Sequence, residues 1–297
     1  MTAHDISQND PELLAIDVTN MNFAYKEEQV LNDITMEIPQ GERVLVIGAN
    51  GAGKSTLLKI LAGKRLTPGT NARMLGKDVF RAPPKGITYL GTEWALNPVV
   101  RGDIVVERFL DSVGGYRHKE RRDRLLNILD VDLDWHMHQI SDGERRRVQL
   151  VMGLMEPWDI LLLDEVTVDL DVLVRGDLMD FLIQESKERK ATIVYCTHIF
   201  DGLDIFPTQV IHMQLGSIPQ QPVAWPPARD DSSIAGQDKR GSDLLSVALG
   251  WLKDDRALRR RLEVEAGGPK RGARGTTDTK DAKTFYERYE YNAPEVR

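Results

Sequence analysis

Residues 43–55 read RVLVIGANGAGKS, and this stretch decides the fold. Its first part, RVLVIG, is a nearly unbroken apolar run of the kind that forms a strand buried on both faces. After the glycine-rich loop, STLLKILAG (55–63) repeats apolar residues at helical spacing and places Gly63 at the expected helix end. A strand, a loop and a helix in this order form the first half of a βαβ unit, and they predict an α/β protein.

The glycine-rich loop, GANGAGKS (48–55), fits the pattern G-x-x-x-x-G-K-[ST] in the strand-to-helix context that this pattern requires. Glycines let successive backbone N–H groups curl around phosphate oxygens. Lys54 should reach the β- and γ-phosphates of a nucleoside triphosphate, and Ser55 should bind Mg²⁺. The residues expected to line the nucleotide here are Gly48, Asn50, Gly51, Gly53, Lys54, Ser55 and Thr56. A glycine-rich surface turn is the alternative, but it does not explain why all these features occur together.

Two acidic residues end a second apolar run, DILLLDE (159–165). Ligands of a parallel α/β sheet gather at the carboxyl ends of its strands, so Asp164 and Glu165 should lie near the phosphate loop. We expect Asp164 to bind Mg²⁺, directly or through water, and Glu165 to polarise the attacking water. An acidic turn after a strand is the alternative interpretation of this stretch taken alone.

Composition sets further limits. The chain has 297 residues and a net charge of −7, which does not indicate bulk attraction to nucleic acid or to anionic membranes. The single cysteine, Cys196, lies in the apolar run ATIVYCT and should be a buried core thiol. No signal peptide is visible, and the apolar runs are far below the roughly 20 residues of a membrane-spanning helix. These features favour a soluble, intracellular protein.

Patterning along the chain predicts its organisation. We expect two strands within 16–38, two or three helices within 103–134, a helix over 173–189, a buried strand over 191–198 and a closing hairpin over 209–218. The predicted parts are a flexible N-terminus (1–15), a nucleotide-binding domain (16–218), a linker rich in Pro, Asp, Ser and Gly (219–241) and a C-terminal helical and aromatic extension (242–297).

The stretch ISDGERRRVQL (140–150) begins like a helix, yet it stacks arginines at the helix end that carries partial positive charge. With the phosphate loop before it and LLLDE after it, ISDGE resembles the signature motif of the ATP-binding-cassette (ABC) ATPases, usually LSGGQ. The resemblance covers about residues 16–218. It implies a P-loop NTPase with a RecA-like core, an antiparallel β subdomain and a helical signature subdomain, to which a C-terminal extension is added here.

The resemblance also implies an ATP-dependent head-to-tail homodimer. In this family Ser141 Oγ and the Gly143 N–H would donate to the γ-phosphate of an ATP held by the other subunit. That triphosphate can offset cations at the helix start, and Glu144 helps within the chain. The arginines, Arg145 to Arg147, need not touch ATP, and we expect most of them on a solvated or inter-lobe face.

Three more positions match the family one at a time. Tyr25, in NFAY, looks like the aromatic residue that stacks on adenine. Asp171, in VTVDLD, resembles the loop acid that links the two active sites across the dimer. His198, at the end of ATIVYCTH, matches the switch histidine that contacts the γ-phosphate, although a lone histidine or tyrosine is more often incidental or part of the packing.

Two positions depart from the family pattern. Asp142 stands where the signature usually has glycine, and a carboxylate this close to a γ-phosphate is unfavourable unless it turns away. Thr92 stands where most ABC ATPases have a glutamine that touches Mg²⁺ and relays to a membrane domain. Thr92 can still offer an oxygen to a metal-bound water. The residue that usually couples the ATPase to a membrane domain is, however, altered.

These departures, with the added tail, resemble the small soluble ABC ATPases of eukaryotes. Fungal members are described as associated with the CCR–NOT transcription and mRNA-decay complex, which implies a regulatory ATPase in the cytoplasm and also the nucleus. The alternatives are an ATPase subunit of a transporter with a separate membrane chain, and an ATP-gated interaction module with little hydrolysis.

The extension has one amphipathic stretch. Apolar residues expected on one side of a helix are Leu244, Ala248, Trp251 and Leu252, with Leu245 and Leu249 beside them. We expect this stripe to pack on the protein's own ATPase domain, and the alternative is a docking helix for a partner. A second anchor would be formed by Phe285, Tyr286, Tyr289 and Tyr291.

Overall fold

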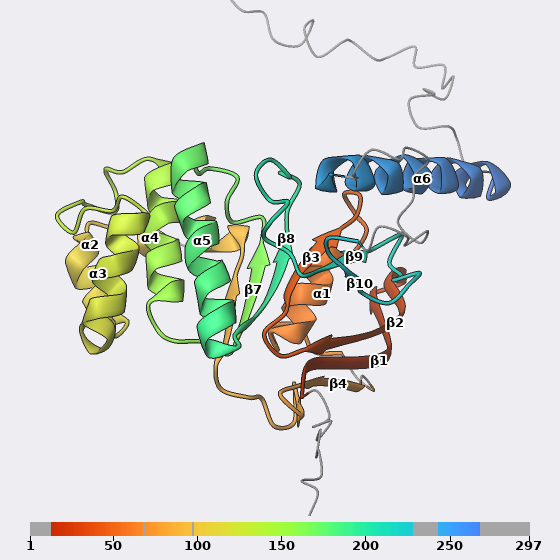
Figure 1. The fold of residues 1–297 in the computed structure, drawn as a ribbon, viewed down its shortest axis with the longest axis horizontal. Coiled ribbons are helices and arrows are strands. Elements are labelled where there is room, and N and C mark those ends of the chain that lie inside the picture. The colour runs from red at the N-terminus through yellow and green to blue at the C-terminus, as the bar shows by residue number, and fades with distance from the viewer. Residues whose placement is uncertain (1–12, 68, 70, 97, 228–242, 268–297) are drawn as a thin grey trace, which may run out of the picture. The chain divides into compact units, whose positions relative to one another are not determined.

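The computed structural model describes residues 13–67, 69, 71–96, 98–227 and 243–267 (Figure 1). The described residues fall into two compact units, which divide between Arg256 and Ala257 within the last helix. All elements before the last helix belong to the first unit. No helix of the described residues is both long enough and apolar enough to cross a membrane.

A six-stranded sheet forms the centre of the first unit. Its strand order is β10 (Val223–Ala224), β9 (Gln209–His212), β3 (Arg43–Ile47), β8 (Thr192–Cys196), β7 (Ile160–Asp164) and β6 (Ile87–Leu90). The pairs between β9 and β6 are all parallel, and β10 is antiparallel to β9. Every residue of β3, β7 and β8 is buried, which confirms the strands predicted from their apolar runs.

The hairpin predicted over 209–218 is wrong for its first strand. β9 pairs in parallel with β3, placing Ile47 opposite His212. Only a single antiparallel bridge, Gln214 with Ser217, remains of the hairpin. In the central sheet β9 lies between β3 and β10, and both strands supply hydrogen-bond partners for its backbone. This arrangement replaces the predicted hairpin.

A second sheet is antiparallel and has the order β2 (Glu28–Pro39), β1 (Leu14–Tyr25), β4 (Asn71–Met74) and β5 (Lys77–Asp78). The two strands predicted within 16–38 are therefore confirmed. Lys26 turns the chain between them in the left-handed region, at φ 55°.

Helices occupy the remaining described segments. They are α1 (Lys54–Leu61), η1 (Thr92–Leu96), η2 (Pro98–Arg101), α2 (Val106–Ser112), η3 (Gly115–His118), α3 (Lys119–Ile128), α4 (Asp142–Leu154), α5 (Val172–Arg189) and α6 (Leu244–Glu265). Figure 1 shows α2, α3, α4 and α5 on one side of the central strands, and β1, β2 and β4 on the other.

Two cores follow from the alternation of side chains along the central strands. Val44 and Val46 of β3 pack in one core with α1 and the antiparallel sheet. Leu45 and Ile47 of the same strand pack in the other core with the helical part. Since β3 is anchored on both faces, the loop that follows it starts from a fixed point.

The first part of α6 belongs to the core of the first unit. Leu244, Val247 and Ala248 are buried in the same core as α4 and α5. This confirms packing on the protein's own domain for Leu244 and Ala248, and Trp251 packs against the same core, whereas the flanking Leu245 and Leu249 are exposed. The aromatic anchor over 285–291 lies outside the described residues.

Part of the predicted linker is also structured. Within 219–241, β10 pairs with β9, and Trp225 is buried in the core with its indole N–H donating to Asp204 O at 2.9 Å. The Pro-rich stretch therefore packs on the first unit at least as far as Trp225 and includes a short strand.

Candidate functional site

The phosphate loop lies between β3 and α1, and two of its glycines are required by contacts. A Cβ on Gly48 would come within 2.3 Å of Met213 O, which belongs to the segment after β9. Gly53 has φ 98°, and a Cβ there would come within 2.7 Å of a Leu31 methyl. The neighbouring Asn50 and Gly51 are exposed, so the loop is open on the side where a phosphate chain would lie.

Lys54 folds back onto this loop. Its Nζ donates to Gly48 O at 2.7 Å and to Ala49 O at 3.1 Å, and the side chain is buried. Burial lowers the pKa of the Lys54 ammonium, and the nearby carboxylates of Glu165 and Asp164 oppose that shift. An ammonium held only by carbonyl oxygens can turn to a stronger anionic acceptor such as a phosphate.

Ser55 and Asp164 meet as predicted. Ser55 Oγ donates to Asp164 Oδ1 at 3.0 Å, across the sheet edge formed by β3, β8 and β7. The sequence did not predict Tyr89, whose hydroxyl donates to Asp164 Oδ2 at 3.2 Å from the neighbouring strand β6. Burial raises the pKa of the Asp164 carboxyl, and the hydrogen bonds from Ser55 and Tyr89 oppose the rise.

This pair of oxygens fits Mg²⁺. The ion prefers hard oxygen ligands and takes few of them from protein when a phosphate chain supplies the others. A hydroxyl and a carboxylate oxygen 3.0 Å apart, beside an open phosphate loop, provide that donor set. Burial of Asp164 adds a reason for a cation, because an ion would stabilise the charged carboxylate.

Glu165 and His198 also come together. His198 Nε2 lies 2.9 Å from Glu165 Oε1, and about a third of each side chain is exposed. Burial lowers the pKa of the His198 imidazole, the Lys54 ammonium adds to this, and Glu165 opposes it. Glu165 has φ 54°, a conformation that costs of order 1–3 kcal/mol for a non-glycine residue and clusters at functional sites.

At the start of α4, Ser141 caps the helix. Its Oγ accepts from Glu144 N at 3.2 Å, and Glu144 Oε2 accepts in turn from Ser141 N at 2.8 Å. Asp142 turns toward cations: its Oδ1 lies 2.5 Å from Arg145 Nη1 and 3.3 Å from Arg101 Nη2. The carboxylate that departs from the family pattern is therefore paired within the chain.

The arginines of this helix do not form a solvated face, and that part of the expectation is wrong. Arg145 is buried and donates to Met137 O at 3.0 Å as well as to Asp142. Arg146 is buried too and donates to Gly91 O at 3.1 Å. It therefore joins α4 of the helical part to the end of β6 in the central sheet, as the inter-lobe alternative expects. Carbonyl and carboxylate oxygens offset the charges of Arg145 and Arg146, although both residues lie at the positive end of the helix.

The last predicted residues occupy separate places. Tyr25, at the end of β1, is partly exposed, and the Arg65 guanidinium lies 4.9 Å over its ring. Asp171 caps α5, its Oδ1 accepting from the N–H groups of residues 173 and 174 at 3.0 Å. Thr92 is exposed at the start of η1, and among the described residues no hydrogen bond joins it to Ser55 or Asp164.

Comparison with known proteins identifies the family. A family model described as ABC transporter matches residues 31–168. CCR4-associated factor 16 of Saccharomyces cerevisiae is 41% identical over 277 aligned residues, covering 82% of this chain and 96% of that protein. ABC transporter I family member 20 of Arabidopsis thaliana is 36% identical, and the alignment covers 85% of this chain and 81% of that protein.

Solved structures agree on the fold. An ATP binding subunit of an ABC transporter has a TM-score of 0.64 at 21% identity, covering 80% of this chain and 99% of its own. A dimeric ATP-binding cassette bound to ADP and Pi has a TM-score of 0.56 at 20% identity, covering 69% of this chain and 97% of its own. Since the relatives extend over most of both chains and the fold agrees, this protein belongs to the ABC family and is a nucleotide-binding ATPase.

Proposed function

We propose that this ATPase hydrolyses Mg-ATP as a homodimer whose two copies meet head to tail. Each nucleotide is held between the phosphate loop of one copy and the start of α4 in the other. The solved cassette that carries ADP and Pi is dimeric, which supports the arrangement for the family fold.

One observation on this chain carries the proposal: apolar side chains are exposed on both sides of Asp171. Val168 is 53% exposed, Val172 is 77% exposed and Leu173 is 73% exposed. A patch of this kind beside a helix start is costly in water and marks a surface that another protein covers. A second copy that covers it would also bring the start of its α4 to the opposite phosphate loop.

Residues of this chain have distinct roles in the proposal. Lys54 leaves the carbonyls of Gly48 and Ala49 to bind the γ-phosphate, and the loop N–H groups hold the phosphate chain. Glu165 orients the attacking water and accepts its proton, while His198 holds Glu165 and faces the transferred phosphate. Mg²⁺ on Ser55 and Asp164 would neutralise part of the phosphate charge.

Nucleotide recognition outside the phosphates falls to Tyr25. Its ring is the expected stacking surface for adenine, and the Arg65 guanidinium now lies over it. The Arg65 guanidinium over this ring supports the proposal, because a face that stacks on a flat cation suits a flat base as well. Thr92 would contribute an oxygen near the metal only through water.

Sedimentation of the Glu165→Gln variant tests the dimer. With saturating Mg-ATP it should form a dimer, and without nucleotide it should be a monomer. Replacing Val172 and Leu173 by serine in the same background should weaken the dimer without changing ATP binding to the monomer. A Val113→Ser variant, which changes another exposed apolar residue, is the matched control. Monomer alone at tens of micromolar protein and saturating Mg-ATP would refute the proposal.

We assign this dimer to a regulatory assembly of the CCR–NOT type, located in the cytoplasm and the nucleus. The support is the name of the Saccharomyces cerevisiae relative, CCR4-associated factor 16, together with 41% identity over most of both chains. Purification of the tagged protein from native cells should recover CCR4-containing complexes. Recovery of integral membrane proteins instead would reject this assignment.

A second candidate function has its own support. The Arabidopsis thaliana relatives carry the names ABC transporter I family members 20 and 21, at 36% and 39% identity. In that case the chain would energise a separately encoded membrane domain. The exposed Thr92 in place of the usual glutamine weighs against this function, and the same native purification decides between the two.

A further inference from the structure

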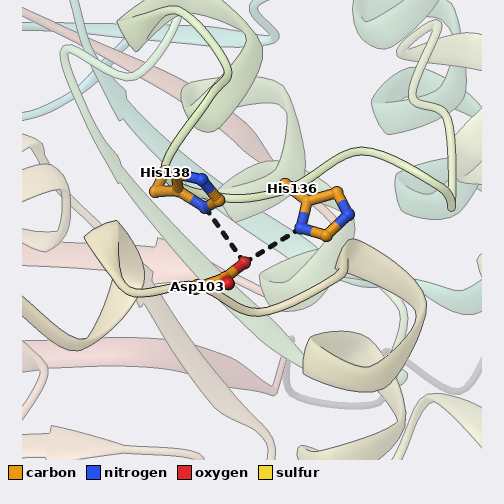
Figure 2. Close-up of side chains that lie close together, drawn as sticks. All are labelled: Asp103, His136 and His138. Atoms are coloured by element: carbon orange, nitrogen blue, oxygen red, sulfur yellow. Dashed lines mark hydrogen bonds and ion pairs between the residues drawn. The ribbon is translucent and has the colours of Figure 1, made fainter.

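Two histidines and an aspartate meet on the surface of the helical part, on the segments that precede α2 and α4. Figure 2 shows the rings of His136 and His138 turned toward Asp103. His136 Nδ1 lies 3.0 Å and His138 Nδ1 lies 3.2 Å from the same oxygen, Oδ1 of Asp103. We propose that these three side chains bind one divalent transition-metal ion of the Zn²⁺ type.

The backbone holds the three ligands in place. An antiparallel bridge pairs Val105 with His136, so the segment that begins at Asp103 runs beside the one that carries the histidines. The segment from His136 to Gln139 is a turn, which Gln139 N closes by donating to His136 O at 2.9 Å. Met137 is fully buried in the core, whereas the side chains of His136 and His138 on either side of it are exposed and meet at Asp103. The three ligands therefore lie on two backbone segments that the bridge between Val105 and His136 holds together.

The distances suit a small ion. Zn²⁺ binds nitrogen and oxygen at about 2.0–2.2 Å, so two ligand atoms of a tetrahedral site lie about 3.3 Å apart. The two N to O distances, 3.0 and 3.2 Å, are close to that spacing. All three ligand atoms lie within 4.8 Å of one another, and the exposed rings can turn to close the remaining gap.

The chemistry of the ligands selects the metal. Two imidazoles with one carboxylate favour Zn²⁺ and similar transition metals, whereas Mg²⁺ and Ca²⁺ prefer oxygen alone. Once both Nδ1 atoms bind the ion, each neutral imidazole carries its proton on Nε2. For His138 an acceptor is at hand, because the Gln139 carboxamide lies 3.1 Å from Nε2 and can present its oxygen there. A three-ligand site leaves a position for water.

The position of the site gives it a consequence for the ATPase. Arg145 of α4 donates to Met137 O at 3.0 Å and to Ile140 O at 2.9 Å, which ties the histidine segment to the helix that Ser141 caps. An ion on Asp103, His136 and His138 would therefore fix the chain that leads into α4. Its effect would be to order the start of that helix before a nucleotide arrives.

Titration of the full-length protein with ZnCl₂, followed by calorimetry in excess Mg²⁺, tests the site. The wild type should bind one Zn²⁺ per chain at this site. The His136→Ala/His138→Ala double variant and Asp103→Asn should each bind it at least about tenfold more weakly, since even loss of a supporting partner of a ligand costs 10–100-fold. Zn²⁺ should also raise the Tm of the wild type and not that of the double variant.

Two matched controls make the result specific. His118→Ala combined with Asp134→Asn removes one imidazole and one carboxylate from the same part of the chain and should bind Zn²⁺ as the wild type does. His198→Ala should do the same, which excludes zinc binding at the nucleotide residues. Undiminished binding by the His136→Ala/His138→Ala variant, or no binding by the wild type, would overturn the proposal and leave a hydrogen-bonded cluster only.

Discussion

His198 Nε2 lies 2.9 Å from Glu165 Oε1, so these two groups are arranged as a pair. The pair stands at the carboxyl ends of two adjacent parallel strands, β7 and β8, and Asp164 lies opposite Cys196 in their register. Glu165 N continues that pairing by donating to Cys196 O at 2.9 Å. Sheet geometry, rather than a flexible loop, therefore sets the distance between the two side chains.

The first prediction concerns Glu165. Glu165→Gln should bind ATP and lower the hydrolysis rate by at least about 10²-fold, because a general base contributes 10²–10⁴-fold. The amide oxygen can still accept from His198, so the loss would come from proton transfer and not from misplacement. Phosphate release under single-turnover conditions measures it. Hydrolysis at the wild-type rate would remove Glu165 from its assigned role.

The second prediction concerns Lys54. Lys54→Ala should raise the Kd for ATP by at least about tenfold, because a charge-assisted contact of a buried ammonium with phosphate is worth more than about 1.4 kcal/mol. Among the described residues Lys54 Nζ donates to the carbonyls of Gly48 and Ala49, and the loss of these two contacts should leave the fold intact. Binding of a fluorescent nucleotide measures the effect. Lys59→Ala is the control, because Lys59 lies on the same helix as Lys54 and pairs with Glu93 of η1.

The third prediction concerns Asp142. Its carboxylate is paired with Arg145 and Arg101, so we expect no strong repulsion of a phosphate. Asp142→Gly should change the dimer dissociation constant of the Glu165→Gln background by less than about threefold. It should lower the free energy of unfolding by about 0.3–1 kcal/mol, because an acid in the first helical turn is lost. A dimer that tightens tenfold or more would show that the carboxylate faces the nucleotide.

Most of the fold could be predicted because its signals are local. The apolar run before Gly48 and the run that ends at Asp164 specify buried strands by themselves. The contact of Ser55 with Asp164 was predictable as well, since parallel strands bring their carboxyl ends to one edge.

Contacts between distant segments could not be predicted in this way. Tyr89 reaches Asp164 because β6 lies beside β7 in the sheet. The sequence of neither strand specifies which strand will be its neighbour. The contact between Asp103 and His136 could not be predicted for the same reason, since the two residues lie 33 positions apart in the sequence. For α6 the helical period was visible, but the buried face includes Asp255, a residue that apolar patterning assigns to water.

Asp255 is the centre of a buried polar cluster between α6 and β9. Asp255 Oδ1 lies 2.8 Å from His212 Nε2 and accepts from Gln214 Nε2 at 2.8 Å, and both His212 and Asp255 are buried. The Trp251 ring stacks on His212 with ring centroids 4.7 Å apart. His212 ends β9, opposite Ile47. The helix therefore covers the strand end that stands beside the phosphate loop.

Asp255→Ala should lower the free energy of unfolding by about 1–3 kcal/mol, because His212 and Gln214 would lose a buried acceptor. Deleting 242–297 should destabilise the protein further, since the core also loses Leu244 and Ala248. Asp254→Ala, one position along and exposed, should change little. Thermal unfolding of the three proteins beside the wild type makes the comparison. Equal Tm values for the truncated and full-length chains would mean that α6 contributes nothing to the stability of the ATPase, and the helix would then be free to serve a partner instead.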